Sequence, residues 1–359
     1  MEERILKKVT ITVMLMCIMS CAAALGMPQV KAAVQNWFNK AEEERTREER
    51  KLHAMSGVEL LEYNNKQAGF TVEEGQLLET LRIELPLGVS GRDIKLEEDI
   101  LRQEIRIRIP YAGEYYMYEY PTHGHCEGLE RLDFESETGY YGDITLQMDR
   151  LYEVQTDYDR EYFFIQFLTP HEVYDKVIVV DAGHGGQDTG TVKQGVSEKD
   201  INLDIVLKLK ELFGQEEGLK VGVYYTRTQD TDVEDKLRAK LPEKAGADLY
   251  LGIYGNATKS GMMSSINGTQ VMYCEQGQGS QEFARLCLDE LTKELGSSDK
   301  GLVAAGGEDL IYGCKVPAAL VWTGFMTNQE ELSNLCSQEY QQKAAEALYR
   351  AVMQALREE

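Results

Sequence analysis

Short alternating hydrophobic stretches characterise the region between residues 69 and 169. Alternation of apolar and polar positions with period two is typical of half-buried strands. Such stretches occur at Leu81–Leu85, Ile105–Ile109 and Ile144–Met148, and Tyr162–Phe167 is also strand-like. The pattern predicts a small, mostly-β domain over residues 59–172.

From Lys176 onward the pattern changes to apolar strands separated by helical periodicity. Strands are expected at Val177–Val180, Val221–Thr226, Leu249–Tyr254, Gln270–Tyr273 and Ala318–Trp322. Helices are expected at Asp200–Phe213, Glu234–Lys244, Gln281–Leu295 and Glu339–Arg357. Buried strands alternating with helices predict an α/β domain over residues 174–359, in which a sheet is flanked by helices on both faces.

The N-terminal region begins with a hydrophobic segment, Val9–Met27, that contains no charged residue and follows Arg4, Lys7 and Lys8. Such a length spans a bilayer as an apolar helix, and the same features fit a signal peptide cleaved near Cys21–Ala24. The long apolar run favours an uncleaved anchor within residues 1–30. Either form predicts an exported protein, membrane-anchored or secreted, whose C-terminal domain lies outside the cytoplasm.

A charge-dense helical run, Ala41–Leu52, follows this segment. It predicts a solvated stalk over residues 31–58, because no apolar heptad is sustained. The whole chain is acidic, with a formal net charge of −23. This charge repels a phosphate backbone and argues against a nucleic-acid partner. The five cysteines beyond the hydrophobic segment lack metal-site spacing, which favours isolated core thiols.

Two features of the β-rich region have alternative interpretations. The tyrosine-rich segment Tyr111–Tyr120 has rings that stack on sugars in some proteins, although packing is the commoner role of strand tyrosines. His123, His125 and Cys126 are three potential metal donors within four residues. Their spacing fits no recognised metal site, and the neighbouring Pro121 and Gly124 predict a surface loop.

Candidate chemistry lies where the first α/β strand ends. His184 stands in the glycine-rich turn Gly183–Gly186, and Glu198 opens the following helix. A histidine on such a turn beside a helix-start carboxylate is what a His/Glu zinc site needs. Each feature alone also fits a structural role, the histidine in a tight turn and the carboxylate at the helix dipole.

Together these motifs resemble the zinc-dependent N-acetylmuramoyl-L-alanine amidase family, which cuts peptidoglycan. The resemblance rests on the DAGHGG segment at Asp181–Gly186 and the EKDINL segment at Glu198–Leu203. It continues through Tyr225–Arg227, Ala245–Ile253 and Val316–Glu330. It implies an amidase-like fold, a peptidoglycan partner, and His184 and Glu198 at the first two zinc-ligand positions.

Two positions depart from the family pattern. Tyr254 stands where the resemblance places the third zinc-ligand histidine, and Trp322 stands where it places the catalytic glutamate. Indole has no basic site, and a neutral phenol is a poor zinc ligand. No histidine follows His184 in the sequence. We therefore expect weak or absent zinc binding, no catalytic residue at Trp322, and impaired catalysis.

Three hypotheses follow. The first is a cell-wall protein whose amidase-like domain binds peptidoglycan or regulates its cleavage. The second is an active zinc amidase with an altered metal site. The third is an envelope scaffold whose β-rich domain binds an envelope protein partner.

Overall fold

The computed structural model describes residues 13, 14, 17, 20, 28–68, 80–137, 140–215, 218, 220–307 and 309–358. The hydrophobic segment Val9–Met27 therefore lies outside the described residues, apart from four isolated positions. None of the helices within the described ranges is long and apolar enough to cross a membrane. The chain divides into two compact units, Met1–Tyr63 and Asn64–Glu359.

The first unit contains the helix α2 (Pro28–His53), and α3 (Gly57–Ala68) runs across the boundary between the units. The charge-dense run Ala41–Leu52 is helical throughout, as its sequence predicts. Glutamates and basic residues four positions apart form exposed ion pairs along α2, Lys40 with Glu44 and Arg45 with Glu49. Pairs at this spacing lie on one face of a helix and stabilise it modestly.

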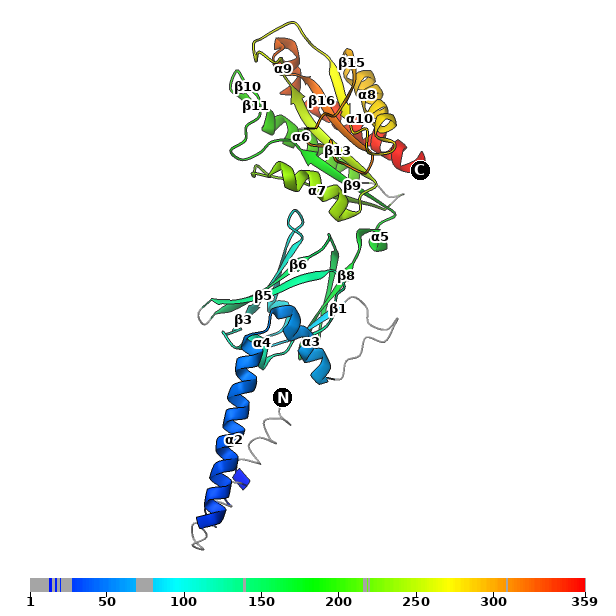
Figure 1. Cartoon of the computed structure of the whole chain (residues 1–359). Coiled ribbons are helices and arrows are strands. Elements are labelled where there is room, and N and C mark those ends of the chain that lie inside the picture. Colours follow the sequence, from blue (N-terminus) through cyan, green and yellow to red (C-terminus); the bar gives the residue numbers. More distant parts are fainter. Residues whose placement is uncertain are drawn as a thin grey trace. The chain divides into compact units, whose positions relative to one another are not determined.

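The β-rich region of the second unit forms two antiparallel four-stranded sheets (Figure 1). One sheet has the order β4 (His123–His125), β1 (Thr80–Glu84), β8 (Tyr162–Leu168) and β7 (Glu153–Tyr158). The other has the order β2 (Lys95–Asp99), β3 (Glu104–Pro110), β6 (Tyr141–Met148) and β5 (Leu129–Glu137). Shorter elements are η1 (Gly91–Asp93), α4 (Tyr116–Glu119) and α5 (Pro170–Val173).

Every second residue of the central strands is buried, as the alternating sequence predicts. Ile105, Ile107 and Ile109 of β3 are buried, as are Ile144 and Leu146 of β6. The loop predicted around the two histidines is wrong, because they form the edge strand β4, paired with β1. Backbone pairing is available there because Gly124 has a φ of +117° and lets the chain approach Thr80 closely.

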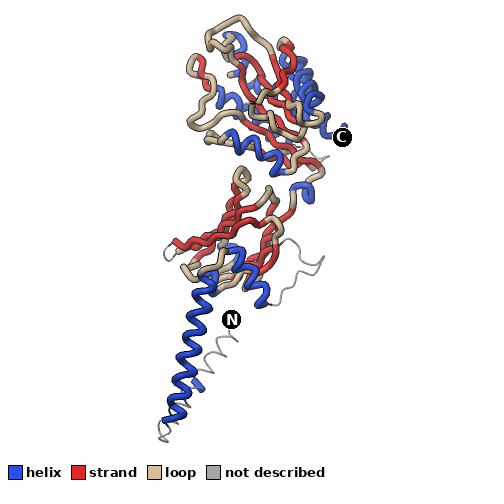
Figure 2. Tube along the Cα trace, viewed as in Figure 1, coloured by secondary structure: helices blue, strands red, loops and turns tan. Residues whose placement is uncertain are grey.

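The α/β region contains one six-stranded mixed sheet, whose strands are red in Figure 2. Its order is β12 (Val221–Tyr225), β9 (Lys176–Ala182), β13 (Leu249–Asn256), β16 (Ala318–Phe325), β14 (Thr269–Tyr273) and β15 (Asp299–Ala304). The first four strands are parallel, and β14 is antiparallel to β16. A small hairpin, β10 (Val192–Lys193) and β11 (Val196–Ser197), precedes α6.

Helices cover both faces of this sheet, as predicted. The first face packs against α6 (Glu198–Phe213), α8 (Ser280–Leu295) and α10 (Gln338–Glu358). The opposite face packs against α7 (Asp235–Ala245), and α9 (Gln329–Leu335) follows β16. Along β13, Leu249, Leu251 and Ile253 belong to the first face, whereas Tyr250 and Tyr254 belong to the α7 face. This period of two decides which side chains can reach the candidate site.

Candidate functional site

The candidate site lies at the carboxyl ends of three adjacent parallel strands. In the sheet register, Asp181 and Ala182 of β9 pair with Gly252 and Ile253 of β13, and Tyr254 pairs with Trp322 of β16. Neighbouring parallel strands end at the same edge, where loops carry functional groups. The register therefore brings the four sequence-predicted positions, His184, Glu198, Tyr254 and Trp322, to one edge of the sheet.

A strained turn positions His184. Its φ is +61°, in the left-handed region, and Gly185 and Gly186 follow with φ of +137° and +56°. A Cβ on Gly185 would lie 2.2 Å from the Thr231 carbonyl oxygen, so only glycine fits there. Arg238 donates a 2.6 Å hydrogen bond to the His184 carbonyl. A non-glycine residue in this region persists only when its surroundings hold it in place.

Buried polar residues from the remaining motifs hold the same turn. Arg227 donates to the carbonyls of Ala182 and Gly183 at 2.9 and 2.8 Å. Asn202 of α6 also donates to the Gly183 carbonyl, at 3.2 Å. These motif residues therefore have a structural role, satisfying backbone carbonyls that would otherwise be buried without a partner.

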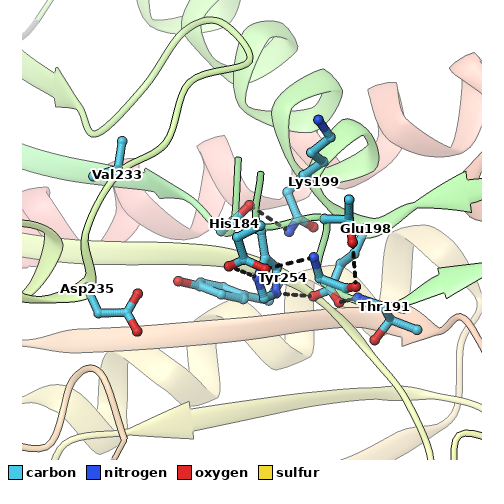
Figure 3. Close-up of polar contacts among 12 residues, drawn as sticks. His184, Thr191, Glu198, Lys199, Val233, Asp235 and Tyr254 are labelled. Atoms are coloured by element: carbon cyan, nitrogen blue, oxygen red, sulfur yellow. Dashed lines mark hydrogen bonds and ion pairs between the residues drawn. The ribbon is translucent and has the colours of Figure 1, made fainter. Parts of the chain in front are cut away.

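Glu198 is almost fully buried at the start of α6. Its Oε2 accepts a hydrogen bond from the Thr191 N–H at 2.9 Å, and its Oε1 accepts one from the Gly255 N–H at 2.9 Å. The same Oε1 lies 3.2 Å from Nε2 of His184 (Figure 3). Both oxygens of the carboxylate are thus already engaged by groups of the protein.

The other ring nitrogen of His184 has a carboxylate partner too, because Nδ1 lies 2.7 Å from Oδ2 of Asp188. Burial lowers the His184 pKa, but hydrogen bonding and attraction to Glu198 and Asp188 outweigh it and raise the pKa to about 9. Burial raises the Glu198 pKa, yet His184 and the two backbone N–H donors bring it below its usual range. The structure therefore places the His184 ring between two carboxylates.

Tyr254 points its phenol away from this ion pair. The hydroxyl donates a 2.9 Å hydrogen bond to Oδ2 of Asp181. Its ring meets the His184 ring edge-on, with centroids 5.5 Å apart and an interplanar angle of 71°. A Cβ on Gly183 would lie 2.4 Å from the Tyr254 ring, so glycine there makes room for the tyrosine. Burial and the Asp181 charge raise the Tyr254 pKa well above its usual value, which keeps the phenol protonated.

Asp181 is a fully buried hydrogen-bond acceptor on the α7 face. It accepts from Thr226 at 2.6 Å, from Arg238 at 2.5 Å, and from Tyr250 and Tyr254 at 2.9 Å each. Arg238 is 2% exposed and supplies the compensating charge. A buried carboxylate is tolerated when it is paired and fully hydrogen-bonded. We name Asp181, Thr226, Arg238, Tyr250 and Tyr254 the Asp181 cluster.

Trp322 stands beside Tyr254 and packs, partly buried, against the hydrophobic cluster on the α7 face. Its indole provides no carboxylate at the position that the resemblance gives to the catalytic glutamate. Glu331 of α9 is the buried carboxylate nearest in sequence, but it accepts hydrogen bonds from the N–H groups of Phe325 and Gly268, at 2.7 and 2.8 Å. Glu331 thus ties α9 to the end of β16.

A zinc site needs about three protein ligands with free lone pairs around a shared centre. Here His184 and Glu198 contact each other directly, and Tyr254 is a protonated donor to Asp181. Within the described ranges, no group of three or more histidine, cysteine or acidic side chains is arranged to hold a metal ion. The residues present therefore do not fit a three-ligand zinc site.

Sequence reasoning missed three residues of this arrangement. Asp188 lies four residues after His184 in the same loop, a signal that the sequence offered. Arg238 and Tyr250 reach Asp181 only through the packing of α7 and β13 on one face of the sheet. No local pattern distinguishes these two from ordinary helix and strand residues.

Comparisons with known proteins place the similarity in the α/β region. The family described as N-acetylmuramoyl-L-alanine amidase matches residues 178–354. The chain is 31% identical over 192 residues to the germination-specific N-acetylmuramoyl-L-alanine amidase of Bacillus subtilis, covering 50% of this chain and 78% of that protein. It is 34% identical over 179 residues to the amidase LytC of the same species, covering 49% of this chain but only 35% of LytC.

Among solved structures, the fold is similar to an N-acetylmuramoyl-L-alanine amidase from Clostridium difficile 630. The identity is 29% and the TM-score is 0.47, with 51% of this chain and 97% of that chain covered.

Proposed function

The chain belongs to the N-acetylmuramoyl-L-alanine amidase family, and from this premise we propose that its α/β domain binds peptidoglycan without carrying out the family's zinc-dependent hydrolysis. The resemblance implies a family reaction in which water attacks the amide between N-acetylmuramic acid and L-alanine. That reaction needs a metal to activate the water and a carboxylate to move its proton. The proposal is that this chain lacks both functions.

The observation that carries the proposal is the orientation of Tyr254. Its hydroxyl donates its proton to the buried Asp181, so the phenol is protonated and engaged there, whereas a zinc ligand beside His184 and Glu198 would have to be deprotonated. A Tyr254 phenolate would also place a second negative charge beside Asp181 in a buried environment, which is costly. Burial therefore opposes the one ionisation through which tyrosine could replace histidine.

The ion pair supports the same proposal. Nε2 of His184 lies 3.2 Å from Oε1 of Glu198 and Nδ1 lies 2.7 Å from Oδ2 of Asp188, so both ring nitrogens already have partners within the protein. The pair neutralises Glu198 without zinc, so the loop of His184 and the start of α6 are joined by protein groups alone. Trp322 supports the proposal as well, because β16 presents an indole beside Tyr254, and an indole cannot accept a proton.

The alternative function is that of a working amidase, and one observation favours it. His184 and Glu198 retain the side-chain types of the first two ligand positions, and their reactive atoms are 3.2 Å apart. Zinc would need to displace the ion pair and recruit a third ligand. The experiment below distinguishes this alternative from the proposal.

Location and partners are part of the proposal. Relatives carry names of cell-wall and germination amidases, and a protein that binds peptidoglycan must be exported to reach it. We propose that the uncharged segment Val9–Met27 anchors the chain in the membrane, that residues 31–58 form a stalk, and that residues 59–172 and 174–359 are separate domains. An envelope protein partner of the β-rich domain remains a further part of this proposal.

The test restores the two family residues with Tyr254→His and Trp322→Glu, singly and together. The parent chain and each single variant should release little peptide from muramyl-peptide substrates, because a metal without a base, or a base without a firmly held metal, lacks half of the reaction. The double variant should bind zinc and release peptide faster than the parent. Parent hydrolysis that requires zinc and is lost on His184→Ala would overturn the proposal in favour of the working amidase.

A further inference from the structure

Four exposed tyrosines occur in the segment after β3 and around the start of β6, and three of them, Tyr111, Tyr140 and Tyr141, lie at one end of the sheet formed by β2, β3, β6 and β5. Tyr111 is 74% exposed, Tyr115 53%, Tyr140 73% and Tyr141 41%. Tyr111 directly follows β3, Tyr115 precedes α4, and Tyr140 and Tyr141 stand at the start of β6. We name these four residues the tyrosine tip. Exposed aromatic residues grouped in this way mark binding sites more often than isolated ones do.

Backbone hydrogen bonding connects the part of the tyrosine tip that follows β3 with the part at the start of β6. The Tyr111 N–H donates a 2.9 Å hydrogen bond to the Tyr140 carbonyl, one step beyond the pairing of Pro110 with Tyr141. Ser136 of β5 donates to the Ala112 carbonyl at 3.1 Å. The two most exposed tyrosines, Tyr111 and Tyr140, are therefore joined directly by a backbone hydrogen bond at the end of the β3–β6 pairing.

Two features fix the geometry of the tip before any ligand arrives. Tyr111 has a φ of +58°, an uncommon left-handed conformation for a bulky residue, which persists only when its surroundings impose it. The Arg108 guanidinium lies 5.7 Å from the centroid of the Tyr141 ring. Arg108 is itself fixed by two 2.8 Å hydrogen bonds to Asp143. Such preorganisation lowers the entropic cost of binding.

The composition of the tip indicates the chemistry of its ligand. Its exposed apolar surface consists of tyrosine alone, which offers a flat apolar face together with a hydrogen-bonding hydroxyl. A pyranose ring has the complementary surface, with a face of C–H groups and a rim of hydroxyls. Glu114, which directly precedes Tyr115, and the overall charge of −23 disfavour acidic ligands such as anionic lipid or the carboxylates of stem peptides.

We propose that the tyrosine tip binds the glycan strand of peptidoglycan by stacking on uncharged N-acetylhexosamine rings. The inference rests on the proposed function, because it assumes that the chain works at peptidoglycan. It adds a second contact to the cell wall, separate in sequence from the α/β site. The tip would hold the glycan, whereas the α/β domain faces the amide between muramic acid and peptide.

The test uses the full chain in detergent and soluble oligomers of N-acetylglucosamine, which carry no peptide and no amide to L-alanine. Binding is measured by calorimetry for the parent and for the double variant Tyr111→Gly and Tyr140→Ala. Glycine suits the left-handed backbone at position 111, so this variant should keep its thermal midpoint. Its affinity should fall about tenfold or more, equivalent to ~1.4 kcal/mol or more.

Tyr312→Phe and Leu87→Ala are matched controls, because Tyr312 is 43% exposed and Leu87 is 92% exposed outside the tip. Both should bind like the parent. Parent affinity that is absent, or unchanged in the double variant, would overturn the proposal. Binding only to an envelope protein would also overturn it and would assign the tip to a protein partner. Because the oligomer has no scissile amide, finding amidase activity in the parent would refute the proposed function and leave this result unaffected.

Discussion

The motif residues of the α/β domain form two groups. One group holds the backbone around the candidate site, and the other occupies the positions that have a chemical role in the family pattern. Asp181, Asn202, Thr226 and Arg227 bind one another or the carbonyls of the turn after β9. Asn328 accepts hydrogen bonds from the Glu330 and Glu331 N–H groups and begins α9. These scaffold residues are present, whereas Tyr254 and Trp322 replace two residues that have a chemical role in the family pattern.

The first prediction concerns the Tyr254 hydroxyl. Tyr254→Phe removes one of four donors to a buried carboxylate, so the free energy of unfolding should fall by about 1–3 kcal/mol. Urea denaturation of the full chain measures this change, with Tyr312→Phe as the control on an exposed tyrosine. An unchanged or increased stability would mean that Tyr254 is not held by Asp181.

The sequence could predict site residues that stand in a recognisable local structure, but not features that depend on contacts with other segments. His184 and Glu198 were identifiable because each stands at a recognisable local structure, a glycine turn and a helix start. The orientation of Tyr254 was not, because it depends on Asp181, 73 residues earlier in the chain. The two carboxylates that contact the His184 ring likewise come from different segments, Asp188 from the same loop and Glu198 from the start of α6.

At the scale of elements, the strands that sequence predicted in the β-rich region are the central ones. β1 and β8 form the middle of one sheet, and β3 and β6 form the middle of the other. The four strands without a prediction are the edges, β4, β7, β2 and β5. Edge strands contribute less to a core and often carry polar residues, so the alternating signal fades, as in the largely exposed β2 and β7.

The same reason explains why β15 was not predicted, because this edge strand of the six-stranded sheet has no buried residue. The short helix α9 was missed because it has only seven residues, QEELSNL, too few for a clear helical period. Its start depends on the Asn328 cap and the buried Glu331 instead. Central strands and long helices were predictable because their burial imposes a period on the sequence.

The second prediction tests how tightly β9 and β13 meet at the site. Gly183→Ala should lower the free energy of unfolding by about 1–3 kcal/mol, because the new methyl group overlaps the Tyr254 ring. Gly307→Ala is the matched control, since an added Cβ there meets nothing within 4 Å. Equal denaturation midpoints for the two variants would contradict the packing of Tyr254 against the turn.

At the scale of the whole molecule, the proposal concerns export, that is, on which side of the membrane the C-terminal domain lies. The third prediction follows from the uncharged segment Val9–Met27 behind three basic residues. A C-terminal reporter that is active only in the cytoplasm should be silent when fused to the full chain. A fusion that lacks residues 1–30 is the control and should be active. Full activity of the complete fusion would show that the chain is not exported.

The proposed loss of zinc-dependent hydrolysis depends on whether His184 and Glu198 hold each other or hold zinc. The fourth prediction is therefore the zinc content of the full chain, measured by mass spectrometry after exposure to zinc and dialysis. With two ligand side chains in an ion pair and a protonated tyrosine at the third position, retained zinc should be far below one equivalent per chain. The variant with Tyr254→His and Trp322→Glu should retain more. Near one equivalent of zinc in the parent chain, lost on His184→Ala, would contradict the proposed function.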